Sequence, residues 1–301
     1  MAASSLEPSP RRWSWARLIV SSSARNYSPL LSLALIAPLM LLLAFSFLYP
    51  VGRLLASSLF NPEVGIDRYV RLLSEPLYLR VLWRTFEIGF IVMLASFVLG
   101  YPVALAMAKL KGRWATIVAA CVLIPLWTSV LVRSYAWIVL LQRNGVINTA
   151  LQEVGLTAGP LQLIYTEGAV IMAMTQVLLP FMILPIYAAL RTIPEDLGRA
   201  ARNLGAGTLT VFLRITLPLS LPGVSAGALM TFILSLGFYV TPALVGGPRT
   251  LMMATLIGQQ ATVLLDWPFA GALSAVLLAA TLLLVTMFRK ALALNKGVSG
   301  V

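Results

Sequence analysis

The run "LLSLALIAPLMLLLAFSFLYP", from Leu30 to Pro50, contains no charged side chain. A stretch this long and apolar predicts a membrane-spanning helix, because about 20 helical residues cross the ~30 Å hydrocarbon core of a bilayer. The run is too long for the core of a signal peptide, and no clear small-residue cleavage site follows it, so we expect a retained anchor. The fold therefore begins with a transmembrane helix.

The composition of the whole chain points the same way. Of the 301 residues, 59% are hydrophobic and only 11% are charged, whereas soluble domains are about 25% charged. The formal net charge is +12, but the basic residues are scattered among apolar runs and form no basic face. We therefore expect contact with membrane lipid and no nucleic-acid partner.

Six apolar runs are each long enough to cross a bilayer as a helix. The sequence therefore predicts an all-α, polytopic membrane protein with a transmembrane domain over residues 30–290, an N-terminal tail over 1–29 and a C-terminal tail over 291–301. The predicted spans are Leu30–Val51, Thr85–Ala108, Ala115–Leu141, Gly168–Leu190, Val224–Val245 and Phe269–Phe288.

The distribution of lysine and arginine predicts the orientation of these spans. Fourteen of the 22 basic residues fall in the N-terminal tail, in Lys109–Arg113, in Arg191–Arg214 and after the last span. These segments lie on one side of a six-span protein, and the side richer in lysine and arginine is cytoplasmic. We expect a bacterial inner membrane protein with both termini in the cytoplasm.

The residues that usually carry out catalysis are scarce. The chain has no histidine and one cysteine, Cys121, inside an apolar run, so the commonest general base and metal ligand is missing. None of the four lysines follows a glycine, so the chain lacks the G-x-x-x-x-G-K-[ST] loop that holds nucleotide phosphates. We expect no catalytic residue, no metal and no cofactor in this chain.

A polar segment, residues 191–222, interrupts the apolar runs. Its centre reads "RAARNLGAGTLTVFLRITLPLSLPG", from Arg199 to Gly223. Thr192 and Glu195 fit a capping box at the start of a helix, and Gly205 is placed to end it. A second short helix would follow, and Pro218 and Pro222 would stop it before the next span. The pattern predicts a helix–turn–helix with an apolar stripe on its first helix, made of Leu197, Ala200, Ala201 and Leu204.

This pattern alone fits either a connector packed against its own bundle or an element that receives force from a partner. The segment also resembles the cytoplasmic coupling signature of permease subunits of bacterial ATP-binding-cassette importers. One departure is Arg199, which stands where the family usually has glutamate. The matching residues are Ala200, Ala201, Leu204, Gly205, Ala206, Phe212, Ile215, Leu217, Pro218, Pro222 and Gly223.

The resemblance implies a type I importer permease fold and a set of partners. These are a second permease subunit, two ATPase subunits that bind ATP and Mg²⁺, and a periplasmic solute-binding protein. It also implies that ATP hydrolysis takes place on the separate ATPase subunits. The residues that would contact the ATPase are Glu195, Arg199, Ala200, Ala201, Leu204, Gly205, Ala206 and Phe212.

Three further segments look like the spermidine/putrescine branch of these permeases, although opine, aminoethylphosphonate and other small-solute importers share much of the pattern. The resemblance implies a small solute as cargo, such as a polyamine or a similar amine, opine or phosphonate compound. The segments are "LVRSYAWIVLLQRNGVIN" (Leu131–Asn148), "GFYVTPALVGGP" (Gly237–Pro248) and "DWPFAGALS" (Asp266–Ser274).

Several residues in or near these segments are candidates for the solute pathway. Arg133 lies within a predicted span, where a charge is costly and often functional; it could equally reach the outer headgroups or pair with Glu167 or Asp266. Aromatic faces beside a carboxylate could hold a cationic amine, or the rings could form an interfacial belt. The candidates are Trp127, Arg133, Tyr135, Trp137, Tyr239 and Asp266.

Three other functions remain to be weighed. An ion-coupled secondary transporter acting without an ATPase would need carboxylates in the middle of its spans, and the predicted spans have acidic residues only at their ends. A membrane-embedded enzyme is disfavoured by the missing catalytic residues. A scaffold without transport would be recognised by uptake that is unchanged when the chain is removed.

Overall fold

The computed structural model describes residues 29–60 and 65–298, and every regular element in that part of the chain is helical. The predicted N-terminal tail lies outside the described residues, apart from its last one. The chain divides into two compact units at Arg53 and Leu54. The predicted all-α membrane fold is confirmed, because five described helices are long and apolar enough to cross a membrane and a bent pair would supply a sixth.

The first unit is the anchor predicted from the apolar run. It contains α1 (Pro29–Leu43), a π-helical turn (Ala44–Leu48) and the start of α2 (Tyr49–Phe60). Together they form a continuous helical span that ends at Phe60, later than predicted. Its large apolar side chains, Phe45 among them, are exposed, as expected of a helix surrounded by lipid.

Four long helices dominate the second unit. The most extensive packing joins α8 to α4 and to α11, and α8 contributes more buried residues than any other described helix. The long helices are α4 (Pro76–Lys109), α8 (Glu167–Thr192), α11 (Leu217–Leu236) and α13 (Trp267–Val298).

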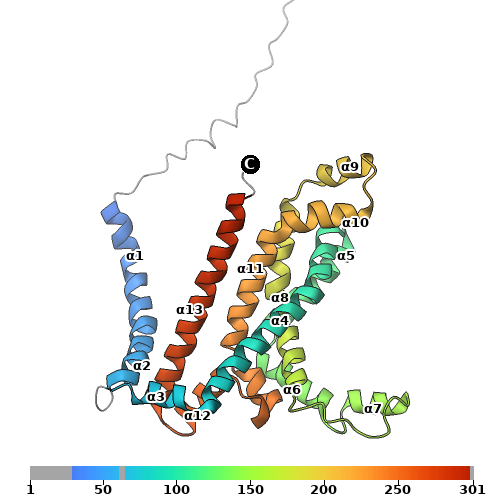
Figure 1. Cartoon of the computed structure of the whole chain (residues 1–301). Helices are drawn as coiled ribbons and strands as arrows, with labels where there is room; N and C mark the ends of the chain where they lie inside the picture. Colours follow the sequence, from blue (N-terminus) through green and yellow to red (C-terminus); the bar gives the residue numbers. More distant parts are fainter. Residues whose placement is uncertain (1–28, 61–64, 299–301) are drawn as a thin grey trace, which may run out of the picture. The chain divides into compact units, whose positions relative to one another are not determined.

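Shorter helices lie at the two ends of the second unit. Figure 1 shows α9 and α10 at one end, where α13 also finishes, and α3, α7 and α12 at the opposite end. The arrangement fits the prediction that the coupling segment and the end of the last span share one side. The shorter helices are α3 (Asp67–Ser74), α5 (Arg113–Trp127), α6 (Val130–Leu141), α7 (Val146–Glu153), α9 (Glu195–Asn203), α10 (Thr208–Val211) and α12 (Met253–Thr262).

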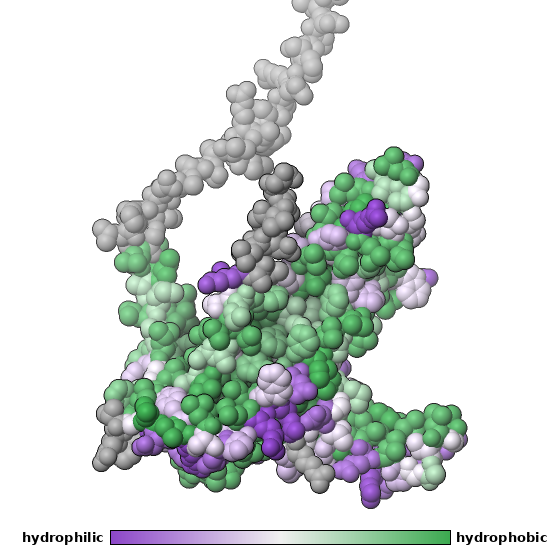
Figure 2. All heavy atoms as spheres, viewed as in Figure 1, coloured by the Kyte–Doolittle hydropathy of each residue, from purple (hydrophilic) through white to green (hydrophobic). Residues whose placement is uncertain are grey.

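The face seen in Figure 2 is mostly hydrophobic along the helices of the second unit, and hydrophilic residues gather toward their ends. This is the distribution that a bilayer requires of a spanning bundle. The polar end opposite α9 includes α3, where Arg71 binds Glu75 at 3.2 Å and lies 4.7 Å from the ring centre of Phe269. The hydrogen bond to Glu75 raises the pKa of Arg71, which stays cationic.

Two of the predicted spans differ from the structure. The third, Ala115–Leu141, is divided into α5 and α6, and the helical axis bends by 102° between Arg113–Trp127 and the stretch Val130–Glu153, which contains α6 and α7. Thr128 and Ser129 are extended there, just after Pro125, which cannot donate a helical hydrogen bond. The fifth span is displaced: its helix begins before Val224 and ends at Leu236, ahead of Gly237.

Glycines allow α11 to approach α8 closely. Gly223 and Gly227 form a G-x-x-x-G pair on α11. A Cβ atom added to Gly223 would lie 2.6 Å from the Pro185 carbonyl oxygen, and one added to Gly227 would lie 2.9 Å from the Met182 carbonyl oxygen. Small residues at such contacts bring membrane helices together.

Candidate functional site

The predicted coupling segment forms α9 and α10 at one end of the bundle. α9 begins after Pro194, and its first turn carries Glu195 and Asp196. Their negative charges stabilise the helix, because they lie at the positive end of its dipole. The predicted capping box is wrong, because the Thr192 hydroxyl donates to the Ala189 carbonyl within α8 at 2.8 Å. Thr192 is the last residue of α8. Its hydroxyl therefore bonds a carbonyl of α8 and does not cap α9.

Gly205 ends α9, as predicted. Its φ angle is +85°, which glycine adopts without the strain of a Cβ atom. The Gly205 N–H donates to the Arg202 carbonyl and the Ala206 N–H donates to the Ala201 carbonyl. These two bonds are the Schellman pattern that closes a helix, and they fix the angle between α9 and the chain that follows.

Arg199 is held by carboxylates of its own helix. It donates to Glu195 at 2.8 Å and lies 3.5 Å from Asp196. Acidic residues three and four positions before a basic one stabilise an exposed helix. Arg199 therefore neutralises the first turn of α9, where the usual glutamate would add to its negative charge.

The apolar stripe of α9 is left uncovered by the part of the chain that the structure describes. α9 contributes no buried residue, and Leu204 is 89% exposed. Ala200 is exposed and Ala201 is partly exposed. The stripe can therefore contact another protein.

The second arm of the segment continues into the bundle. A stop at Pro218 and Pro222 was predicted, but α10 passes through a π-helical turn, Phe212–Thr216, directly into α11. In that turn the Leu217 N–H bonds to the Phe212 carbonyl five residues back. π turns and close packing let membrane helices run through prolines, so the arm and the span are one continuous helical element.

Phe212 connects this arm to α4. Its ring meets that of Tyr101 edge to face, with 5.6 Å between the ring centres. The Tyr101 hydroxyl lies 2.8 Å from the Ser220 hydroxyl of α11. Sequence reasoning missed Tyr101 and Ser220; the only signal was a polar aromatic residue inside an apolar run.

A cavity of about 420 Å³ lies between α9 and the ends of α4 and α8. Its charged lining residues carry a net positive charge, because four are basic and only Glu195 is acidic. The basic ones are Lys109, Lys111, Arg199 and Arg202.

The residues predicted for the solute pathway do not gather at one place. Trp127 ends α5 and is 90% exposed, and Tyr135 on α6 is also exposed. Trp137 donates to the Gln176 amide oxygen of α8 at 3.4 Å. Asp266 accepts a hydrogen bond from the Phe269 N–H at 3.0 Å and so caps the start of α13.

Arg133 is the least satisfied of these candidates. One of its terminal nitrogens donates to the Thr128 carbonyl at 3.4 Å. Its other two nitrogens are buried without a hydrogen-bond partner in the described part of the chain. The suggested pairing with Glu167 or Asp266 is wrong, because Glu167 binds Arg84 and Asp266 caps α13.

Tyr239 lies just after the end of α11. It lines a cavity of about 380 Å³ that also includes Gln259 of α12 and the turn Pro248–Thr250. α11 ends at Leu236, and residues 237–239 are not helical before the chain continues to the π-helical turn Pro242–Gly246. The break after α11 therefore brings Tyr239 to a cavity.

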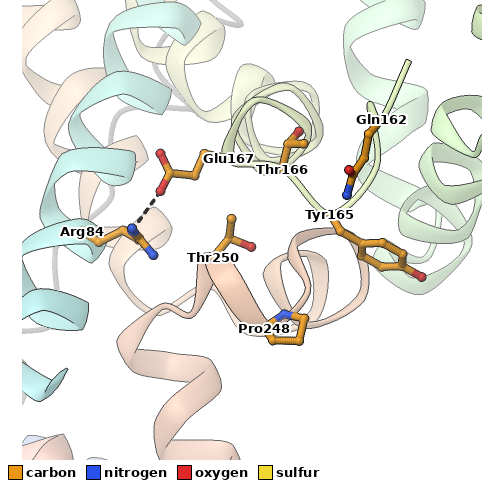
Figure 3. A pocket seen from close by; sticks show the side chains of 7 residues that line it. All are labelled: Arg84, Gln162, Tyr165, Thr166, Glu167, Pro248 and Thr250. Atoms are coloured by element: carbon orange, nitrogen blue, oxygen red, sulfur yellow. Dashed lines mark ion pairs between the residues drawn. The ribbon is translucent and has the colours of Figure 1, made fainter. Parts of the chain in front are cut away.

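A larger cavity, of about 700 Å³, is also lined by Pro248 and Thr250 (Figure 3). Arg84 of α4 and Glu167 of α8 reach toward each other at its edge, with 2.9 Å between the Arg84 Nε and a Glu167 carboxylate oxygen. Sequence reasoning did not propose either residue for the pathway. The remaining lining residues are Gln162, Tyr165, Thr166, Pro248 and Thr250.

The backbone holds this cavity in shape at Tyr165. Its φ angle is +62°, a conformation that is rare for residues other than glycine. The Tyr165 N–H donates to the Val245 carbonyl at 3.0 Å. Gly247 lies against the Tyr165 side chain, so an added Cβ would come within 3.1 Å of it.

Comparison with known families gives a match over most of this bundle. Residues 96–296 match the family described as binding-protein-dependent transport system inner membrane component. The spermidine/putrescine transport system permease protein PotB of Haemophilus influenzae is 34% identical over 254 residues, covering 84% of this chain and 87% of the relative. PotB of Escherichia coli is 36% identical over 234 residues, covering 77% and 85%.

Solved structures share the fold. A bacterial ABC transporter involved in the import of the acidic polysaccharide alginate has a chain that superimposes with a TM-score of 0.72, at 20% identity, covering 86% of this chain and 95% of that one. A chain of the MetNI methionine ABC transporter gives a TM-score of 0.57 at 21% identity, covering 71% and 94%. At this identity the likeness is one of fold.

Proposed function

Because this chain belongs to the binding-protein-dependent transport system inner membrane component family and is a permease subunit of an ABC importer, we propose that it imports a polyamine together with four other subunits. These are a second permease subunit, two ATPase subunits and a periplasmic solute-binding protein. ATP and Mg²⁺ would be held by the ATPase subunits. The relatives named for spermidine and putrescine transport support this cargo.

The observation that carries the proposal is the uncovered apolar stripe of α9. A connector that packs on its own bundle would bury that stripe, whereas here α9 contributes no buried residue and Leu204 is almost fully exposed. A groove on an ATPase subunit would cover it. Glu195, Arg199 and Leu204 would then face the partner, and Gly205 and Ala206 would form the rigid end of the docked helix.

Movement of the docked helix would reach the bundle through two connections. α10 is continuous with α11 through the π-helical turn, and Phe212 contacts Tyr101 of α4. When the ATPase subunits close on ATP, a displacement of α9 would therefore shift α4 and α11 together. Such a shift would alternate the opening of the bundle between its two ends.

The proposed orientation puts α9 in the cytoplasm and the cavity beside Glu167 on the outer face. The excess of lysine and arginine at the α9 end supports it, and both termini would be cytoplasmic. The solute-binding protein would then deliver cargo at the end that carries α3, α7 and α12.

The test is uptake of labelled spermidine by vesicles that contain both permease subunits and the ATPase subunits, with the binding protein outside and ATP inside. We expect uptake that requires ATP, and loss of uptake in Gly205→Glu. Gly207→Ser is the matched control, because Gly207 has an ordinary φ angle and no atom within 4 Å of an added Cβ. Uptake that continues without ATP and collapses with an ionophore would overturn the proposal.

A further inference from the structure

We propose that Glu167 is an exchange site for an ammonium group at the outer mouth, where an amine cargo takes the place of Arg84. This inference rests on the proposed polyamine cargo and adds a specific residue to its path. It concerns the cavity of about 700 Å³ at the edge of which Arg84 and Glu167 meet.

Glu167 is the only carboxylate among the residues that line this cavity. It is the first residue of α8, which places its negative charge at the positive end of the helix dipole. Its side chain is 50% exposed, and its ion pair with Arg84 uses one carboxylate oxygen, 2.9 Å from the Arg84 Nε. The carboxylate therefore faces the cavity and can accept a further donor.

The other polar groups of the cavity differ in their availability. The Thr166 hydroxyl donates to the Leu163 carbonyl and accepts from the Ala169 N–H, and the Thr250 hydroxyl donates to the Gly246 carbonyl. Both hydroxyls are thus occupied by the fold. The Gln162 amide makes no hydrogen bond in the described part of the chain and lies across the cavity from Glu167 (Figure 3).

Exchange at Glu167 would cost little. The Arg84 side chain is 31% exposed and the Glu167 side chain 50%, and ion pairs with this degree of exposure contribute little to stability. An arriving ammonium group replaces one cation by another, so the charge around the carboxylate is preserved. A cargo with one or more ammonium groups fits this chemistry, and an anionic cargo does not.

The exchange would also act on the bundle. The Arg84–Glu167 pair joins α4 to α8 at the outer end, and the next residue of α4, Thr85, accepts the Met253 N–H of α12 at 2.8 Å. Release of Arg84 removes this ion pair between α4 and α8, while their apolar packing and the hydrogen bond from α12 to Thr85 remain. Arrival of cargo would thereby loosen one contact between two helices that line the mouth.

The experiment uses two variants that break the same ion pair from opposite sides. Equilibrium binding of labelled spermidine is measured on the purified complex of both permeases and the ATPase subunits, without the binding protein. We expect Glu167→Gln to raise the Kd by about three- to ten-fold, because a charge-assisted contact is lost. We expect Arg84→Gln to lower the Kd, because the carboxylate loses its competing cation.

A purely structural ion pair predicts the same direction of change in both variants. Equal shifts, no shift in either variant, or no spermidine binding by the wild-type complex would overturn the exchange site. Vesicle uptake by the same wild-type complex with its binding protein separates the two proposals. Normal uptake of spermidine with a failed binding test removes the exchange site alone, whereas absent uptake despite active ATPase subunits removes the polyamine cargo and the exchange site with it.

Discussion

Gly205 shows how one residue fixes the coupling segment. Its φ angle of +85° closes α9, and an added Cβ would meet no atom within 4 Å. Gly205→Ala should therefore act through backbone strain alone, at a cost of about 1 kcal/mol to the end of α9. Hydrogen exchange of the Gly205 and Ala206 amides should become faster, while Gly207→Ala should leave it unchanged. Equal protection in both variants would contradict this account.

Arg199 departs from the family pattern without losing helix stability. Its pairs with Glu195 and Asp196 lie on the surface, so we expect Arg199→Gln to change the stability of α9 by less than about 0.5 kcal/mol. Arg199→Glu would instead place three carboxylates on adjacent positions of one helix. Hydrogen exchange across α9 should be faster in Arg199→Glu than in Arg199→Gln, and the difference should shrink in high salt.

Sequence reasoning at this scale predicted that Gly205 ends the helix α9, but not the contacts that the segment makes with the bundle. The spacing of Arg199, Gly205 and Pro218 could be read directly, since it depends on local order along the chain. The contact between Phe212 and Tyr101 joins residues more than a hundred positions apart. Nothing local in either segment specifies it, which is why Tyr101 and Ser220 were missed.

The contact between Tyr101 and Phe212 yields a prediction about the link between α4 and the coupling segment. Tyr101→Phe keeps the ring against Phe212 and loses only the hydroxyl contact to Ser220. Tyr101→Ala removes the ring as well. We expect the amount of solute transported per ATP to be nearly normal in Tyr101→Phe and strongly reduced in Tyr101→Ala, measured in vesicles. Equal loss in both would place the effect at the hydroxyl.

The packing of α11 on α8 makes a prediction for Gly223. A Cβ at this position would lie 2.5 Å from the Ala189 Cβ and 3.1 Å from the Ile186 Cα, and these atoms cannot move without shifting α8. We expect Gly223→Ala to destabilise the permease by about 1–3 kcal/mol. A fluorescence melt in detergent should show a lower Tm, with Gly237→Ala as the control, since an added Cβ there meets nothing within 4 Å.

Among the helices, length and apolar composition were enough to predict the spans, but not where they bend. The division of the third span follows from Pro125 and the extended Thr128 and Ser129. Yet Pro218 and Pro222, which looked like equally strong breakers, lie in a continuous helical element. A proline ends a membrane helix only where neighbouring helices or a π turn do not satisfy the freed backbone groups, and that depends on packing.

For the whole molecule, charge distribution predicted which segments share a side, and the second unit has α9 and the end of α13 at the same end. The outer cavity could not be predicted, because it joins Arg84 to Glu167 across two helices that are distant in sequence. From the sequence, aromatic residues and Asp266 were predicted as candidates to hold a cationic amine. The structure gives Asp266 a capping role and leaves Glu167 as the carboxylate beside a cavity.

The orientation of the whole molecule can be tested by cysteine labelling. Cys121 is the chain's single cysteine, so Cys121→Ala gives a background without thiols. Ala158 is exposed in the loop between α7 and α8, and Gly207 is exposed beside α9, so a cysteine at either site is open to solvent. Because the segments at the α9 end hold ten of the 22 lysines and arginines and the opposite end and adjoining span ends hold eight, we expect a membrane-impermeant thiol reagent to label Ala158→Cys in cells whose inner membrane is intact. Gly207→Cys should react only after that membrane is permeabilised.

The reverse pattern would place α9 outside the cell, where no ATPase subunit could reach it, and would remove the physical basis for ATP-driven coupling.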